Sequence, residues 1–119
     1  LFTPLGRRLI WLERLTEESF DSVIAFVPQS TIGDKVSSVI YMCHEDKEWP
    51  TDARMLLNIH DALIAIHRPN DKDIVQRLMK KHAEAPIMIR GEPVVIYTDL
   101  KESHPGEDGV HRWSTLKEI

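Results

Sequence analysis

The chain has 119 residues, of which 42% are hydrophobic and 29% are charged, a composition that fits one globular domain or a piece of a larger one. Its formal net charge of −4 at pH 7 lacks the basic surplus that freestanding nucleic-acid-binding proteins usually carry, because counterion release from phosphates drives their binding. Either the chain binds no nucleic acid, or the surface that neutralises phosphates lies elsewhere in a larger protein. Composition leaves both readings open.

The sequence shows no signal for a membrane or for an oxidising compartment. No apolar run approaches the about 20 residues that span a bilayer, and no signal peptide opens the chain, so no membrane partner is expected. Leu1 stands where a full-length protein would have Met, so we expect a chain cut from a longer protein. Cys43 is the only cysteine, which excludes an internal disulfide and favours a reducing cytoplasm. Its place in a helical pattern favours a small buried residue.

The first quarter of the chain predicts a hairpin and then a helix. Residues 1–11 alternate weakly around Gly6 and are typical of a short hairpin. Thr16 is predicted to cap a helix over residues 17–26, because its side chain can accept a hydrogen bond from the first turn. Glu17 and Glu18 follow it, at the positive end of the helix dipole.

Pro28 is expected to interrupt this helix, since proline lacks the backbone donor and crowds the preceding turn. A second helix then ends near Glu45, with apolar side chains at spacings of three and four. These side chains are Ile32, Val36, Val39, Ile40 and Cys43. Residues 46–50 are expected to form a loop.

Residues 55–66 are the most apolar part of the chain and predict two short strands that meet at a tight turn holding His60 and Asp61. A helix over residues 71–82 follows, capped by Asn70. Its apolar stripe consists of Ile74, Val75, Leu78 and Met79.

The last third predicts strands at residues 87–89 and 94–97, the second begun by Pro93, where a missing donor is tolerated. Residues 102–119 are expected to be mostly irregular, with Trp113 packed back onto the body. The order of elements predicts an α+β fold, in which a small antiparallel sheet packs against two or three helices.

His60 and Asp61 are the polar anomaly of the apolar hairpin. Burying an unpaired carboxylate is costly, so Asp61 is expected to be paired, hydrogen-bonded, bound to a metal or facing a cleft. The simpler alternative is that aspartate favours turns for local reasons. Rigid apolar strands on either side would suit a carboxylate that binds a metal.

Other metal chemistry finds little support among the six histidines. They share no ligand spacing, and no Cys-x-x-Cys or His-Glu-x-x-His pattern accompanies them. The His60-Asp61 pair is similar to that of the HD class of metal-dependent phosphohydrolases. Those enzymes, however, place the pair in an all-helical bundle, whereas here it lies between β-branched runs.

Two further groups could meet nucleic acid. Gln29 follows the predicted helix break, where its amide could present both a donor and an acceptor to a base or sugar edge. Arg7 and Arg8 are paired arginines at a strand edge, which are usually solvated and become phosphate contacts only in a suitable context.

Taken together, these segments resemble the C-terminal stretch of family A (DNA polymerase I-like) DNA polymerases. Residues 3–9 (T-P-L-G-R-R-L) are similar to the T-x-x-G-R-R strand that follows the fingers, and residues 28–34 (P-Q-S-T-I-G-D) to the Q-G-T-A-A-D start of a long palm helix. Residues 57–62 (L-N-I-H-D-A) resemble motif C, usually Q-V-H-D-E. Residues 93–96 and 109–113 resemble the closing strand and the terminal G-x-N-W. Each segment alone is weak, but the order and the spacings match over nearly the whole chain, and the second segment looks phage-like.

The resemblance implies that residues 1–119 are the C-terminal part of a polymerase palm, from a bacterium or a phage-infected cell. It also implies that Asp61 is the second of two catalytic aspartates. Two-metal phosphoryl transfer uses carboxylates that hold a pair of Mg²⁺ ions about 3.5 to 4 Å apart. One ion would activate the primer 3′-hydroxyl and the other would hold the triphosphate. By the same resemblance, His60 and Gln29 would contact the primer terminus and the minor-groove edge of the nascent pair, with Arg7 and Arg8 as further nucleic-acid-binding residues.

The departures from the family pattern limit what the chain can do alone. Ala62 replaces the usual glutamate, and Asp21 and Ala25 stand near positions where many relatives carry Arg and Asn facing the template. The D-Y-S-x-x-E motif with the first aspartate and the fingers helix that binds the triphosphate are missing. The chain is therefore expected to be inactive in isolation, with weak Mg²⁺ and DNA binding. Its partners would be primer–template DNA, dNTP and the remaining palm, fingers and thumb.

Two alternatives stay open. A single-subunit RNA polymerase also carries a His-Asp turn, although the Gln-Ser-Thr helix start favours the DNA enzyme. The chain could instead be a freestanding non-enzymatic module or a degenerate remnant, which predicts a stable monomer or dimer. A sheet without its palm neighbours would expose an apolar face, so self-association of the isolated chain is expected.

Overall fold

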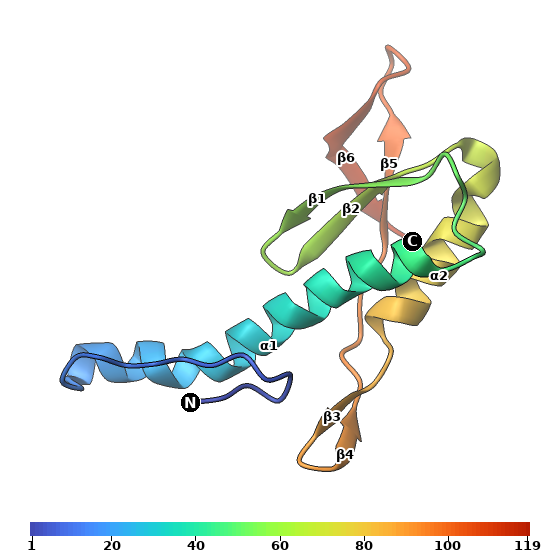
Figure 1. The fold of residues 1–119 in the computed structure, drawn as a ribbon. Coiled ribbons are helices and arrows are strands. Elements are labelled where there is room, and N and C mark those ends of the chain that lie inside the picture. Colours follow the sequence, from blue (N-terminus) through green and yellow to red (C-terminus); the bar gives the residue numbers. More distant parts are fainter.

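The computed structural model describes all of residues 1–119 and shows an α+β fold with two helices and three small antiparallel sheets (Figure 1). The helices are α1 (Glu17–Glu45) and α2 (Lys72–Ala83), and a 3₁₀ turn (Pro69–Asp71) precedes α2. The strands are β1 (Arg54–Ile59), β2 (Ala62–Ile66), β3 (Ile87–Ile89), β4 (Glu92–Val94), β5 (Lys101–Pro105) and β6 (His111–Glu118). Each strand pairs only with its neighbour in sequence, so β1–β2, β3–β4 and β5–β6 are separate hairpins rather than one sheet.

The start of α1 follows the prediction at Thr16. The Thr16 side chain accepts a hydrogen bond from the Ser19 backbone N–H, and the Ser19 hydroxyl accepts one from the Thr16 N–H at 2.8 Å. This reciprocal capping box satisfies two backbone donors that helix geometry leaves without partners. Glu17 and Glu18 lie in the first turn, where the helix dipole favours negative charge.

The expected break at Pro28 was wrong, because α1 runs through it as a single helix of 29 residues. Pro28 lacks the N–H that would bond the Ile24 carbonyl, and the Thr31 hydroxyl donates to the Val27 carbonyl at 2.6 Å. Both features bend this helix without ending it, and Figure 1 shows α1 as one gently bent helix. Gln29 therefore lies inside the helix rather than at its start.

The core lies where the C-terminal half of α1 crosses α2. Ten of the 119 residues are buried, and Cys43 is fully so, as its helical position predicted. Burial raises the pKa of the Cys43 thiol to about 11, which makes it an inert packing residue. The buried hydrophobic residues are Val36, Val39, Cys43, Ala53, Val75, Leu78 and Ile87.

Lys35 joins the two helices at the edge of this core. The residue is 5% exposed, and its Nζ donates to the carbonyls of His82 at 3.0 Å and Ala85 at 2.7 Å. His82 lies in the last turn of α2 and Ala85 follows the helix, so the amine sits at the helix end whose dipole favours a cation. Desolvation of the buried amine lowers the pKa of Lys35.

The second half of the chain departs from the prediction at three places. Asn70 makes no capping hydrogen bond, because it lies inside the 3₁₀ turn and Asp71 precedes the first residue of α2. The strand expected at residues 94–97 is β4, which begins at Glu92 and ends at Val94. The expected irregular tail is wrong as well: residues 101–118 form the β5–β6 hairpin, and Trp113 is 60% exposed instead of packing back.

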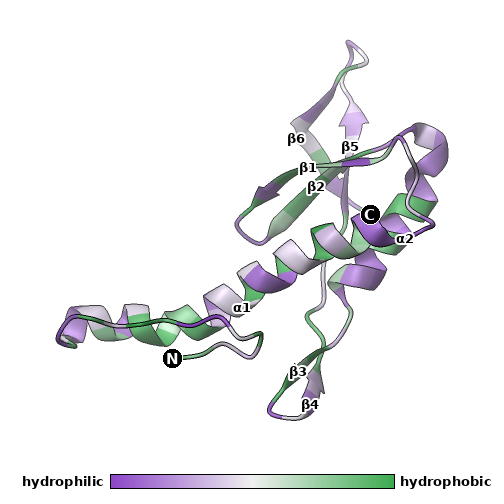
Figure 2. Ribbon diagram, viewed as in Figure 1, coloured by the Kyte–Doolittle hydropathy of each residue, from purple (hydrophilic) through white to green (hydrophobic).

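Much apolar surface remains open. Figure 2 shows hydrophobic stretches along the β1–β2 hairpin, in the N-terminal half of α1 and in the segment that precedes it. Large side chains in these parts are exposed, including Leu57, Ile66, Trp11 and Phe20. Neither helix has an apolar stretch long enough to cross a membrane.

Candidate functional site

The predicted hairpin with His60 and Asp61 at its tip is present. Strands β1 and β2 pair antiparallel, and the last pair of their register is Ile59 with Ala62, so His60 and Asp61 form the turn between them. The hairpin extends back alongside α1 in Figure 1. Asp61 is therefore neither in a helix nor in the core, the two placements that would have excluded a metal-binding role.

His60 holds a strained backbone conformation, with φ of 53°. This left-handed region costs a residue other than glycine roughly 1–2 kcal/mol, and histidine is among the residues that tolerate it. The other non-glycine residue with positive φ is Arg90, which Gly91 follows in the usual pattern of a tight hairpin turn. His60 is followed by Asp61 instead, so a histidine and an aspartate occupy a turn that glycine would form at lower cost.

Both side chains at the tip are exposed, and neither takes part in a hydrogen bond or an ion pair. The expectation that Asp61 would need a partner rested on burial, and exposure to water removes that need. The strands are also less buried than their apolar sequence predicts: Leu56 and Leu57 are about half exposed. The tip presents a free carboxylate and a free imidazole to whatever approaches it.

The chain does not form a complete metal site by itself. No group of three or more His, Cys, Asp or Glu side chains lies close enough to hold an ion. Asp61 has the oxygen donors that Mg²⁺ prefers, but an ion of this kind usually needs one or two carboxylates together with substrate phosphates.

The other predicted site residues lie on or against α1. Gln29 is exposed on the helix, and Arg8 is exposed in a short bridge with Phe2. Arg7 instead bonds Asp34 of α1, through Nε at 2.9 Å and through Nη2. No hydrogen bond or ion pair joins these residues to the hairpin tip.

Asp34 received no role from the sequence, although it lies in the matched P-Q-S-T-I-G-D segment. The resemblance already singles out one segment with two arginines and one with an aspartate. A possible ion pair between these two segments was the signal that could have pointed to Asp34. Thr3 was missed in the same way. It is 5% exposed, and its hydroxyl accepts a hydrogen bond from the Arg7 N–H at 2.9 Å.

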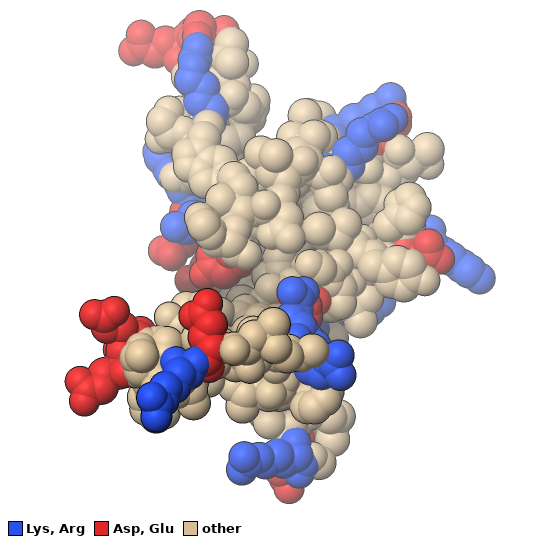
Figure 3. Space-filling model, turned by 60° about the vertical axis from the view of Figure 1, so that its left-hand side comes forward, with Lys and Arg blue, Asp and Glu red and all other residues tan.

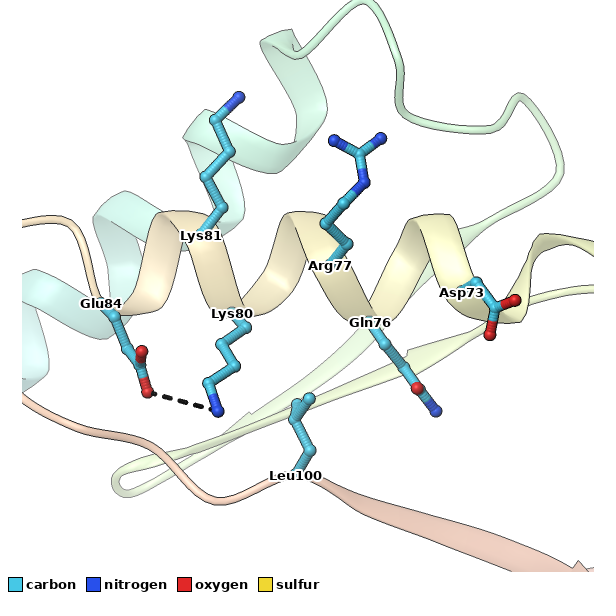
Figure 4. A pocket seen from close by; sticks show the side chains of 7 residues that line it. All are labelled: Asp73, Gln76, Arg77, Lys80, Lys81, Glu84 and Leu100. Carbon is cyan, nitrogen blue, oxygen red and sulfur yellow. Dashed lines mark ion pairs between the residues drawn. The ribbon is translucent and has the colours of Figure 1, made fainter. Parts of the chain in front are cut away.

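The charged surface of α2 offers no competing site. Figure 3 shows positive and negative groups interspersed on one face of the molecule. A shallow hollow on α2, drawn in Figure 4, is lined by Asp73, Gln76, Arg77, Lys80, Lys81, Glu84 and Leu100. Its cations have acidic partners: Arg77 pairs with Glu48, Lys81 with Asp46, and Lys80 with Glu84. An anion would have to displace these carboxylates.

Comparisons with known proteins found no matching family model, no significantly similar curated protein and no significantly similar solved structure.

Proposed function

We propose that the chain is the C-terminal part of the palm of a family A DNA polymerase, and that Asp61 supplies one of its two catalytic metal-binding carboxylates. The observation that carries the proposal is the exposed, unpaired His60-Asp61 turn at the tip of the β1–β2 hairpin. A carboxylate at such a tip is accessible to a metal ion and a phosphate without any rearrangement of the fold.

The backbone of the turn supports a role for both side chains. His60 keeps a left-handed φ of 53°, although glycine would adopt it without strain. Strained backbone of this kind clusters at functional sites, so it supports a role for the His60 side chain. In the proposed enzyme, the imidazole of His60 contacts the primer terminus beside the carboxylate of Asp61.

The metal chemistry is shared with the rest of the enzyme. When bound, Mg²⁺ would activate the primer 3′-hydroxyl and stabilise the leaving group, and Asp61 would hold it on the side of this chain. This chain provides one carboxylate and no cluster of three ligands, so a second carboxylate comes from another part of the palm. The isolated chain is accordingly inactive.

Primer–template DNA and dNTP are the proposed partners. Gln29, exposed on α1, suits a contact with the minor-groove edge, whose acceptors are shared among base pairs. Such a contact tests the shape of a base pair rather than its sequence. Because the chain has a net charge of −4, the proposal requires that most phosphate neutralisation comes from other parts of the enzyme.

The test is primer extension by the full-length protein with Asp61→Asn, an isosteric change that removes the charge. We expect the single-turnover rate to fall at least about 100-fold, since even second-shell changes at metal sites cost 10- to 100-fold. Asp99→Asn is the matched control, because Asp99 is also exposed and has no hydrogen-bond or ion-pair partner. Wild-type rates for Asp61→Asn, with Mg²⁺ saturating, would refute the role of Asp61.

The same assay separates the alternatives. A single-subunit RNA polymerase would extend with NTPs rather than dNTPs. A non-catalytic module would extend with neither, and its full-length sequence would lack both the first-aspartate motif and the fingers helix. The isolated 119-residue chain serves as the negative control in every arm.

A further inference from the structure

One ion pair anchors the N-terminal segment to α1. The Nε of Arg7 lies 2.9 and 3.2 Å from the two carboxylate oxygens of Asp34, and its Nη2 also bonds Oδ1. Arginine and carboxylate meet here through more than one N–H, the geometry that gives such pairs directional strength. The Asp34 side chain is 18% exposed, so the pair is partly shielded from water.

A tight turn fixes the direction in which Arg7 leaves the chain. The Thr3 N–H donates to the Arg7 carbonyl at 2.8 Å, and the Arg7 N–H donates to the Thr3 hydroxyl at 2.9 Å. The Gly6 N–H closes the turn on the Thr3 carbonyl at 2.9 Å, with Gly6 at φ of 89°. Only glycine adopts this conformation without strain. Thr3, Gly6 and Arg7 thus form one unit that docks on Asp34.

Arg8 faces a different environment. Consecutive residues of an extended segment point to opposite sides, and Arg8 forms a backbone bridge with Phe2. Its side chain is exposed and makes no ion pair or hydrogen bond. Of the two arginines, Arg8 alone carries a charge that no carboxylate of the chain balances.

We infer that Arg7 is a positioning residue, held by Asp34 so that the N-terminal turn is fixed on α1, and that Arg8 is the residue that contacts a nucleic-acid phosphate. The inference rests on the proposed function. It divides the Arg-Arg pair, which the sequence presents as two equal cations, into an anchor and a ligand. In this chain the T-P-L-G-R-R segment supplies the arginine of the pair and the P-Q-S-T-I-G-D segment supplies the aspartate.

A phosphate contact by Arg7 would work against the fold. Arg7 would have to leave Asp34, which would strand a partly shielded carboxylate close to the incoming phosphate. Like charges at this distance repel, so the exchange would lose the ion pair and weaken the new contact. Arg8 can bind a phosphate without either loss.

The experiment measures binding of the full-length protein to a primer–template duplex between 50 and 200 mM salt. Each phosphate contact contributes about 0.9 to the slope of log Kobs against log[salt]. We expect Arg8→Gln to reduce the slope by about 0.9, so that its affinity deficit relative to wild type shrinks about threefold over this range. We expect Arg7→Gln to lower affinity by a factor that stays constant with salt.

Asp34→Asn distinguishes an anchor from a restrained ligand. An anchor role predicts weaker DNA binding with an unchanged slope. It also predicts that Arg7→Gln/Asp34→Asn, which keeps the wild-type net charge, is no worse than either single change. If Asp34 merely restrained a phosphate-binding arginine, Asp34→Asn would tighten binding and steepen the slope.

The inference is overturned if Arg7→Gln flattens the slope as Arg8→Gln should, or if Arg8→Gln leaves it unchanged. In both cases wild-type binding survives, so the proposed polymerase function stands while the division of roles fails. A wild-type full-length protein that binds no primer–template at any salt concentration overturns the proposed function and the role of Arg8 together. Circular dichroism of each variant establishes that it is folded.

Discussion

The Asp46 carboxylate has hydrogen-bond partners in three different residues. It accepts a bond from the Glu48 N–H at 3.0 Å, and its Oδ2 lies 2.8 Å from Nε2 of His82 and 3.3 Å from Nζ of Lys81. The loop after α1 is thereby tied to the end of α2. These bonds, led by that from the Glu48 N–H, lower the pKa of Asp46 from 3.8 to about 2.

This lowered pKa predicts acid sensitivity of the contact between the helices. A carboxyl group with a depressed pKa contributes stability that is fully present above its unfolded pKa of 3.8 and is lost as the pH falls through about 2. We expect the free energy of unfolding to decrease between pH 4 and pH 2, and Asp46→Asn to make this decrease smaller. Urea unfolding at several pH values measures both.

Asp108 is the matched control, because its pKa is also about 2 but its partner Arg112 lies within the β5–β6 hairpin. Asp108→Asn should reduce the pH dependence of the free energy of unfolding without changing hydrogen exchange at the end of α2. Hydrogen exchange at the end of α2 should speed up in acid for wild type and respond to Asp46→Asn alone. An equal response to both substitutions would show that Asp46 does not act on α2.

At this scale, sequence reasoning succeeds where a residue acts through its own neighbours. Thr16 caps with Ser19, Cys43 follows the helical stripe, and His60-Asp61 occupies the turn between two apolar runs. It fails where the partner is far along the chain. Arg7 meets Asp34 across 27 residues, and Lys35 meets the carbonyl of Ala85 across 50.

Helix α1 shows that a proline can bend an element without ending it. The sequence predicts a break at Pro28, since proline in a helix interior costs about 3 kcal/mol in isolation. Packing of the C-terminal half on α2, together with the capping box at Thr16, keeps both halves helical. The Thr31 hydroxyl donates to the Val27 carbonyl, which is a different acceptor, so the Ile24 carbonyl stays without its helical donor.

Pro28→Ala should therefore stabilise the protein by about 1–3 kcal/mol. Alanine restores a donor for the Ile24 carbonyl, and it has a higher helix propensity than proline. Urea unfolding measures the gain, and far-UV circular dichroism should show equal or greater helix content. Pro69→Ala is the control, since Pro69 opens a 3₁₀ turn, where its missing donor has no helical acceptor. A loss of stability in Pro28→Ala would mean that the bend itself is needed for packing.

The β1–β2 and β5–β6 hairpins differ in how well their sequences predict them. The β1–β2 hairpin has mostly apolar runs on both sides of a two-residue turn, and the sequence predicts it. The β5–β6 hairpin has polar strands, and residues 106–109 between Pro105 and Val110 read only as a loop. Its strands are mostly exposed, so no alternation of apolar and polar residues marked them.

The molecule as a whole is extended for its length. Its radius of gyration is 17.6 Å, whereas a compact chain of 119 residues has about 13 to 14 Å. The buried hydrophobic residues come mainly from α1 and α2, and the hairpins project from this small core (Figure 1). A core this small leaves little free energy in excess of the conformational entropy of folding.

The open face of the β1–β2 hairpin should therefore drive association of the isolated chain. Leu57 is 54% exposed and Ile66 53%, and both edges of this two-stranded sheet are unpaired. We expect light scattering to show dimers or larger species that dissociate on dilution.

Leu57→Lys should weaken association at least about tenfold, as expected from losing a half-buried leucine contact and adding a charge. Tyr97→Lys, at an exposed residue outside any strand, should leave association unchanged. A monodisperse monomer at high concentration that unfolds cooperatively would show that the exposed hairpin needs no partner, and would favour a freestanding module over a palm segment.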